Sequence, residues 1–179
     1  MPEKQTPEPQ TTEAGYDILV STVALRHPLL RRLLADWLHA SPPGGLPGHD
    51  FAAPSRLDYM QGQIVVFDVV PQADGVPRFR YRFVGAPLVA RRGRDVTGTW
   101  MDEHTDALVA KIGPQACGAA MQARRPVHVR SRREIDGETY ALEYLVLPLA
   151  DPQSGRIDRL VSGQIYPSRA PVRSGGDPA

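Results

Sequence analysis

The chain contains no asparagine, a single cysteine and only two lysines. Because Cys117 has no partner within the chain, an intrachain disulfide and a multi-cysteine zinc site are both excluded. Lys4 and Lys111 are the lysines, so 19 of the 21 basic residues are arginines (21 minus 2). Such a bias is typical of a GC-rich coding sequence, and we give the arginine excess little functional weight.

Long hydrophobic runs are also missing. No segment approaches the roughly 20 apolar residues that a membrane span requires, and residues 1–16 lack the apolar core of a signal peptide. The formal net charge is +1, which gives no electrostatic reason to expect binding to nucleic acid or to an anionic membrane. We therefore expect a cytoplasmic protein that binds neither nucleic acid nor membrane.

Proline, glycine, serine and charged residues are concentrated at the two ends of the chain. Residues 1–17 and 167–179 cannot bury enough apolar surface to offset the entropy of ordering, and we expect both to be disordered tails. The remaining residues, 18–166, are enough for one domain with its own core.

An amphipathic helix is predicted over residues 27–40. Its apolar residues recur at helical spacing and form one stripe. Pro28 suits the first helical position, and the Ser41-Pro42-Pro43 run ends the helix. The stripe consists of Leu29, Leu30, Leu33, Leu34, Trp37 and Leu38.

Five strands are predicted after this helix. Residues 63–70 and 78–85 form a hairpin; if Val70 pairs with Arg78, then Asp68 lies opposite Arg80. Phe79, Tyr81 and Phe83 alternate with arginines, which places all three aromatic rings on one face. Residues 127–134 and 139–149 are joined by Asp136-Gly137, a strong two-residue turn signal, and residues 157–166 follow.

Short helices are expected between the second and third strands, over residues 86–92, 102–112 and 114–125. Gly113-Pro114 separates the last two of these. This order of elements predicts an α+β domain: a five-stranded antiparallel sheet with short helices on one face and the amphipathic N-terminal helix as a further cover, either on its own sheet or against a partner chain.

The order of these elements resembles that of the PAS fold. Residues 80–103 (RYRFVGAPLVARRGRDVTGTWMDE) resemble the PAS hairpin strand running into the small helices, and residues 124–129 (RRPVHV) resemble the exit into the third strand. The leucine-rich helix (LLRRLLADWL) is similar to that of a bacterial family of stand-alone PAS-like domains. The resemblance covers residues 25–166.

The resemblance implies a sensory or regulatory module. Such a module binds a small ligand non-covalently between sheet and helices and signals through contacts with another protein, whose identity is unknown; a homodimer is expected. The alternative is a ligand-free module for protein–protein interaction and dimerisation, in which the leucine stripe of residues 27–40 packs across the dimer.

Cofactor chemistry is narrowed by residues that are missing. Haem-binding PAS domains use a histidine on the long helix, and residues 114–125 contain none, so haem is disfavoured; His104 and His128 are expected to be exposed. Thiol-adduct photochemistry needs a cysteine where this chain has Val96. A flavin held without an adduct, or a small apolar metabolite, stays open.

The chain is not expected to be an enzyme or to hold a metal. It has no Gly-x-Ser-x-Gly motif and no Walker loop, and the neighbouring side chains of Asp102, Glu103 and His104 diverge on a helix. Asp68 and Glu143 are the acids within strongly apolar strands, where a catalytic carboxylate could lie. Each has a simple alternative role as a charge partner on the solvent-facing side of the sheet. The predicted ligand pocket consists of Tyr81, Phe83, Trp100, Met101, Cys117, Met121 and Gln164.

Overall fold

A computed structural model of the chain describes residues 10–12, 16–22, 24–135 and 138–166. Its centre is a seven-stranded antiparallel sheet with the order β1-β2-β5-β6-β7-β3-β4. The strands are β1 (Gln10–Thr12), β2 (Tyr16–Leu19), β3 (Ile64–Val70), β4 (Arg78–Val84), β5 (Val127–Ile135), β6 (Glu138–Ala150) and β7 (Ile157–Ile165).

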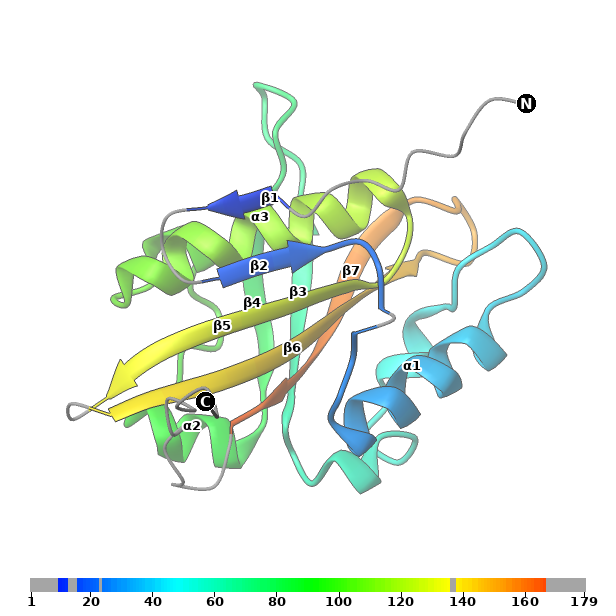
Figure 1. Cartoon of the computed structure of the whole chain (residues 1–179). Helices are drawn as coiled ribbons and strands as arrows, with labels where there is room; N and C mark the ends of the chain where they lie inside the picture. Colours follow the sequence, from blue (N-terminus) through cyan, green and yellow to red (C-terminus); the bar gives the residue numbers. More distant parts are fainter. Residues whose placement is uncertain (1–9, 13–15, 23, 136–137, 167–179) are drawn as a thin grey trace, which may run out of the picture.

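The helices cover both faces of this sheet (Figure 1). One face carries α2 (Ala86–Arg92), the 3-10 turn η3 (Met101–Glu103) and α3 (Ala107–Ala123). The other face carries α1 (Pro28–Ala40) and the 3-10 turns η1 (His49–Ala52) and η2 (Asp58–Met60). None of the helices in the described part of the chain has the length and apolarity needed to cross a bilayer.

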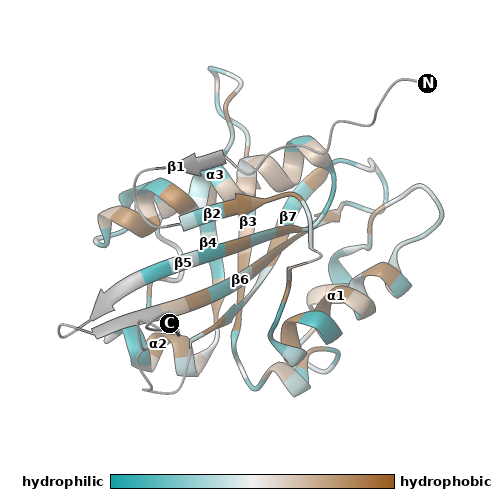
Figure 2. Cartoon of the chain, in the orientation of Figure 1, coloured by the Kyte–Doolittle hydropathy of each residue, from teal (hydrophilic) through white to brown (hydrophobic). Residues whose placement is uncertain are grey.

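Two hydrophobic cores result, one on each side of the sheet. Successive strand residues point to opposite faces, so Val65 and Phe67 of β3 join the core under α3, whereas Ile64 and Val66 join the core under α1. β3, β5 and β6 accordingly carry hydrophobic stretches in Figure 2. A strand that is apolar on both faces reads as a continuous run, as residues 63–70 do.

The predicted α+β class and the central strands are confirmed, and the strand count is corrected from five to seven. β1 lies within residues 1–17, and β2 begins there and runs on to Leu19. The expectation of a disordered tail is therefore wrong for Gln10–Thr12, Tyr16 and Asp17. β2 pairs with β5, and Tyr16 is 2% exposed. The other residues of the two predicted tails, and the Asp136-Gly137 turn, lie outside the described residues.

The helix α1 packs on its own sheet. Its N-cap is His27, whose Nδ1 accepts from the backbone N–H of Leu29 (3.3 Å), and Pro28 takes the first helical position. Leu30, Leu33 and Trp37 are buried in the core shared with β6 and β7. The inner part of the leucine stripe is therefore buried against the chain's own sheet.

The remaining residues of the stripe face outward to different degrees. Leu29 and Leu34 are partly buried at the edge of the same core, and Leu38 is 57% exposed. The indole N–H of Trp37 also donates to the carbonyl oxygen of Pro148 in β6 (3.0 Å), which fixes the helix to the sheet.

The helix α3 is continuous, and the predicted break at Gly113-Pro114 is wrong. An interior proline removes one helical hydrogen bond and costs about 3 kcal/mol. Burial of Ile112, Ala116 and Cys117 along one face offsets this cost. Gly113 also admits Met101 closely, because a Cβ atom there would lie 2.5 Å from the Met101 sulfur.

A glycine of β7 sets the distance between α1 and the sheet. A Cβ atom at Gly163 would lie 2.7 Å from the side chains of both Leu30 and Leu33 and 3.2 Å from Met60. Contacts this short cannot persist, so any side chain at this position must push the helix outward.

We expect the Gly163→Ala substitution to lower the free energy of unfolding by about 1–3 kcal/mol, the usual cost of overpacking a core. Urea denaturation followed by circular dichroism measures it. Gly118→Ala is the matched control: nothing lies within 4 Å of its added Cβ, and alanine favours the helix, so it should be neutral or stabilising. Equal stability of the wild type and Gly163→Ala would contradict this role.

Candidate functional site

A small inner cavity lies between the sheet and the helices α2 and α3. Its volume is about 60 Å³. Aromatic, aliphatic and sulfur side chains surround it, together with a few polar groups. Its lining consists of Phe67, Tyr81, Arg92, Met101, Val109, Ile112, Gly113, Ala116, Cys117, Val129, Tyr144, Val146, Ser162, Gln164 and Tyr166.

Four of the seven residues predicted for the pocket line this cavity: Tyr81, Met101, Cys117 and Gln164. Met121 is partly buried and packs against the same core without lining the cavity. Trp100 forms a β-bridge with Arg80, and the Arg78 guanidinium lies 4.3 Å from its ring centroid. Trp100 therefore belongs to the surface beside β4.

Phe83 lies on the opposite face of the sheet from Tyr81, so the expectation of three aligned aromatic rings is wrong. The pairing of β3 with β4 shifts between Val66 and Phe67: Phe67 pairs with Tyr81, whereas Val66 pairs with Phe83. This β-bulge adds Arg82 to β4, and an extra residue reverses the facing of every later side chain. Strict alternation in the sequence cannot reveal such a bulge.

The one cross-strand charge pair that the sequence predicted, Asp68 with Arg80, is present on this hairpin. Val70 pairs with Arg78 and Asp68 pairs with Arg80, which confirms the predicted register. Asp68 accepts from both Arg80 and Arg82, at 3.2 Å each.

Arg92 brings an unsatisfied donor to the inner cavity, and His104 holds a second one beside Tyr81; neither residue was predicted for the pocket. Arg92 donates through Nη2 to the Gln164 side-chain oxygen (3.0 Å), but its Nη1 is buried and has no acceptor among the described residues. His104 Nδ1 accepts from the Asp106 backbone N–H (3.0 Å), so a neutral ring carries its proton on Nε2. That nitrogen is also buried without a partner in the described chain.

Both groups lie near Tyr81. The His104 and Tyr81 ring centroids are 6.1 Å apart, and the Arg92 guanidinium carbon is 5.8 Å from the Tyr81 centroid. Burial lowers the pKa of His104, with a further contribution from the Arg92 charge, so the ring is held neutral. Burial raises the pKa of Tyr81 to about 12. The cavity therefore offers donors and an uncharged phenol beside one cation.

The cavity residues do not form a nucleophilic centre. Cys117 is 1% exposed, and burial raises the pKa of its thiol far above neutrality, so it is a protonated, unreactive group. Val96, which stands where the photochemical cysteine would be, is buried in the same core.

Glu143, the strand acid considered for catalysis, lies on the other face of the sheet. Its carboxylate accepts from the backbone N–H groups of Arg26 (2.9 Å) and His27 (2.8 Å), directly before α1. The Nε2 atom of His128 lies 2.9 Å from the same carboxylate. Glu143 thus anchors the start of α1 to the sheet.

His128 is fully buried, which corrects the expectation that it is exposed. His104 is half-buried and is corrected in the same sense. Burial lowers the pKa of His128, and the nearby Glu143 opposes this shift only in part. The buried ring therefore disfavours the proton that an unfolded histidine accepts near pH 6.5.

His128 is expected to make stability depend on pH. Above about pH 6.5 the ring is neutral in both states; below it, the unfolded state binds a proton that the folded state disfavours, so stability falls. His128→Gln should reduce this loss by on the order of 1 kcal/mol between pH 7.5 and 5.5. Urea denaturation at both values measures it, with exposed His39→Gln as control. An unchanged pH dependence in His128→Gln would contradict the assignment.

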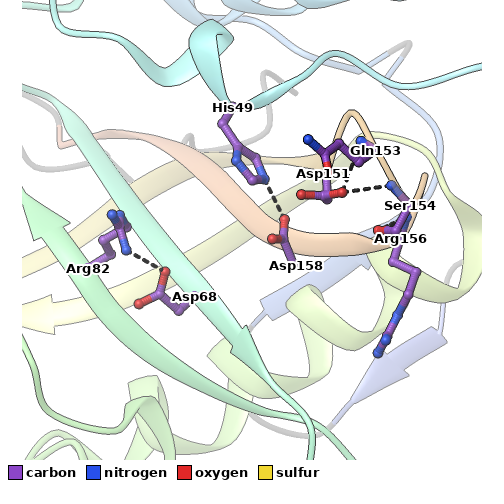
Figure 3. A network of polar contacts seen from close by, with 8 residues as sticks. All are labelled: His49, Asp68, Arg82, Asp151, Gln153, Ser154, Arg156 and Asp158. Atoms are coloured by element: carbon purple, nitrogen blue, oxygen red, sulfur yellow. Dashed lines mark hydrogen bonds and ion pairs between the residues drawn. The ribbon is translucent and has the colours of Figure 1, made fainter.

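The described residues also contain one group of side chains with ligand spacing for a metal ion: His49, Asp151 and Asp158, with ligand atoms within 4.8 Å of one another. Figure 3 shows these side chains around the turn between β6 and β7. His49 Nε2 lies 2.5 Å from Asp158 Oδ1, and Asp151 accepts from the backbone of Gln153 and Ser154. The His49–Asp158 pair and the turn that Asp151 stabilises account for the group without a metal ion.

The predicted cluster of Asp102, Glu103 and His104 does not converge. Asp102 and Glu103 both accept from Arg78, at 2.7 and 2.6 Å, and their side chains lie at the surface. His104 turns inward to Tyr81 instead.

Comparison with known proteins finds no matching protein-family model and no matching curated protein. Solved structures with some similarity include a light-oxygen-voltage domain studied with a flavin analogue (14% identity, TM-score 0.40, 66% of this chain and 88% of that one). An RNA-binding light-oxygen-voltage receptor is 16% identical (TM-score 0.43, covering 68% of this chain and 36% of that one).

A domain of an HTR-like protein from Haloarcula marismortui is 18% identical, with a TM-score of 0.36 over 57% of this chain and 98% of that one. Similarities of this size carry no functional statement. The fold is identified from the chain itself: a hairpin, a series of short helices, and a three-stranded meander whose last strand pairs with the first strand of the hairpin. This arrangement is an antiparallel α+β fold with the order of elements that the sequence analysis expected.

Proposed function

We propose that this chain is a regulatory PAS-like module in which a small ligand occupies the inner cavity and changes contacts with a partner protein. The observation that supports this most directly is the buried Nη1 of Arg92, which has no acceptor among the described residues. An unsatisfied buried donor costs about 1–3 kcal/mol, and more when the group is charged. A bound acceptor would remove that cost.

The size and chemistry of the cavity indicate which ligand fits. A volume of about 60 Å³ is well below the roughly 300–1,000 Å³ of sites for drug-sized ligands. A flavin ring system does not fit this cavity. A small anion or another acceptor-rich molecule does, because Arg92 provides the charge and His104 a second donor nearby.

Arg92 connects the inner cavity to the surface, so a change in its contacts on ligand binding would alter the surface near the end of β7. The Arg92 side chain now bridges α2 to Gln164 at the end of β7. The neighbouring Arg91 lies 4.5 Å from the ring centroid of Tyr166, where the described part of the chain ends. A ligand that accepts the hydrogen bonds of Arg92 would replace Gln164 as its partner and change how α2 contacts the end of β7. We propose that this change alters the binding of a protein partner, which can be a second copy of the chain.

The first test is native mass spectrometry of the purified protein, combined with calorimetric titration of acetate and nitrate as small anionic probes. We expect saturable binding of at least one of them, or a retained molecule of similar size. Arg92→Gln should weaken binding by about tenfold or more, the effect of losing one charged hydrogen bond. The exposed neighbour Arg94→Gln is the matched control.

A second measurement follows the signal. Hydrogen exchange at α2 and at residues 160–166 should change on binding in the wild type and not in Arg92→Gln. A protein that retains no molecule and binds neither probe would overturn the ligand hypothesis and would leave the ligand-free interaction module.

A further inference from the structure

A second and larger depression lies on the other face of the sheet. It has a volume of about 360 Å³, within the range typical of small-molecule sites. Ile64 and Val66 of β3 and Phe83 of β4 line one side, and the segment from η1 to η2 lines the other, with Leu57 among its apolar residues. We refer to it as the outer groove. It shares no lining residue with the inner cavity.

The outer groove exposes apolar surface that a folded protein normally buries. Phe83 is 46% exposed, one of only four exposed large hydrophobic residues in the described chain. The β-bulge at Arg82 places Phe83 there, on the face opposite to Tyr81. An aromatic ring that lines a concave apolar surface is suited to contact the apolar part of a bound ligand.

Two arginines, Arg82 and Arg159, line the outer groove beside this apolar surface. The carboxylates closest to them along the sheet are already engaged. Asp68, the cross-strand neighbour of Arg159, accepts from both Arg80 and Arg82. Asp158, the residue before Arg159, contacts His49. Figure 3 shows both pairs, Arg82 with Asp68 on the hairpin and His49 with Asp158 on β7.

Arg159 is consequently left without compensation. It forms no ion pair with any residue that the structure describes, and its Nε–H is buried without an acceptor there. The one carboxylate that lines the groove, Asp58, is exposed to solvent. A guanidinium with free donors at the edge of an apolar surface is suited to a carboxylate, which accepts two parallel hydrogen bonds.

We propose that the outer groove binds a small monocarboxylate with an apolar body, its carboxylate on Arg159 and its body against Phe83, Val66 and Leu57. Other ligand classes fit less well. A cationic ligand would meet two arginines, and a neutral apolar ligand would leave the Arg159 Nε–H without an acceptor. This site is independent of the inner cavity and would make the domain a binder on both faces of its sheet.

The test is isothermal titration of the full chain with octanoate, below the concentration at which it forms micelles, and with 1-octanol as the uncharged analogue of the same chain length. We expect saturable one-to-one binding of octanoate and at least about tenfold weaker binding of octanol, as for the loss of a charged hydrogen bond. Arg159→Gln should weaken octanoate binding by a similar factor. Arg132→Gln, an exposed arginine of β5, is the matched control and should bind as the wild type does.

A second variant keeps the proposal testable if Arg159→Gln folds poorly. Ala53→Trp adds a large side chain to the lining of the outer groove at a partly exposed position, and should abolish binding while the circular dichroism spectrum stays unchanged. Amide NMR shifts on binding should centre on β3, β4 and the η1–η2 segment. Equal affinity for octanol, or unchanged octanoate binding in both Arg159→Gln and Ala53→Trp, would overturn the proposal.

The two proposed sites can fail separately. Octanoate binding that persists in Arg92→Gln and is lost in Ala53→Trp supports the outer groove whatever the inner cavity binds. Octanoate binding that is lost in Arg92→Gln and kept in Ala53→Trp would place the carboxylate in the inner cavity and would reject the outer groove.

Discussion

The central position of β7 is the constraint on which the rest of the structure depends. This strand lies between β6 and β3. It therefore joins the β3–β4 hairpin to the strands β1, β2, β5 and β6 in one sheet. Its residues alternate between the two cores: Leu160 packs under α3, and Val161 packs under α1. Gly163 then allows α1 to lie directly on the sheet. Both hydrophobic cores therefore include residues of β7.

A sheet covered on both faces has two separate surfaces where a ligand can lie. The inner cavity is small and lies between the sheet and α3; Arg92 in its lining carries one unsatisfied donor, and His104 beside Tyr81 carries another. The outer groove is larger and lies between the η1–η2 segment on one side and the start of β3 and the end of β4 on the other. The bulge at Arg82 affects both sites, because it places Tyr81 in the inner cavity and Phe83 in the outer groove.

Much of the secondary structure could be predicted from local signals. The stripe of α1 and its Pro28 start, the register of Asp68 with Arg80, and the order of strands and helices all follow from spacing within the sequence. The candidate site was predictable only in part. Tyr81, Met101, Cys117 and Gln164 were found because they are apolar or lie on the last strand, whereas Arg92 was missed because an arginine among Arg91, Arg92 and Arg94 has no local feature that marks it as turned inward.

The sequence by itself determined the α+β class, the periodicity of each element and the absence of a disulfide, because these depend on neighbouring residues and on composition. Only the tertiary structure decided that α3 runs through Pro114, that residues 10–12 and 16–19 extend the sheet, and that the leucine stripe is used within the chain. Each of these depends on contacts between residues far apart in sequence, whose burial outweighs local preference. The facing of Phe83 depends on a single bulged residue, which leaves no trace in the alternation of side chains.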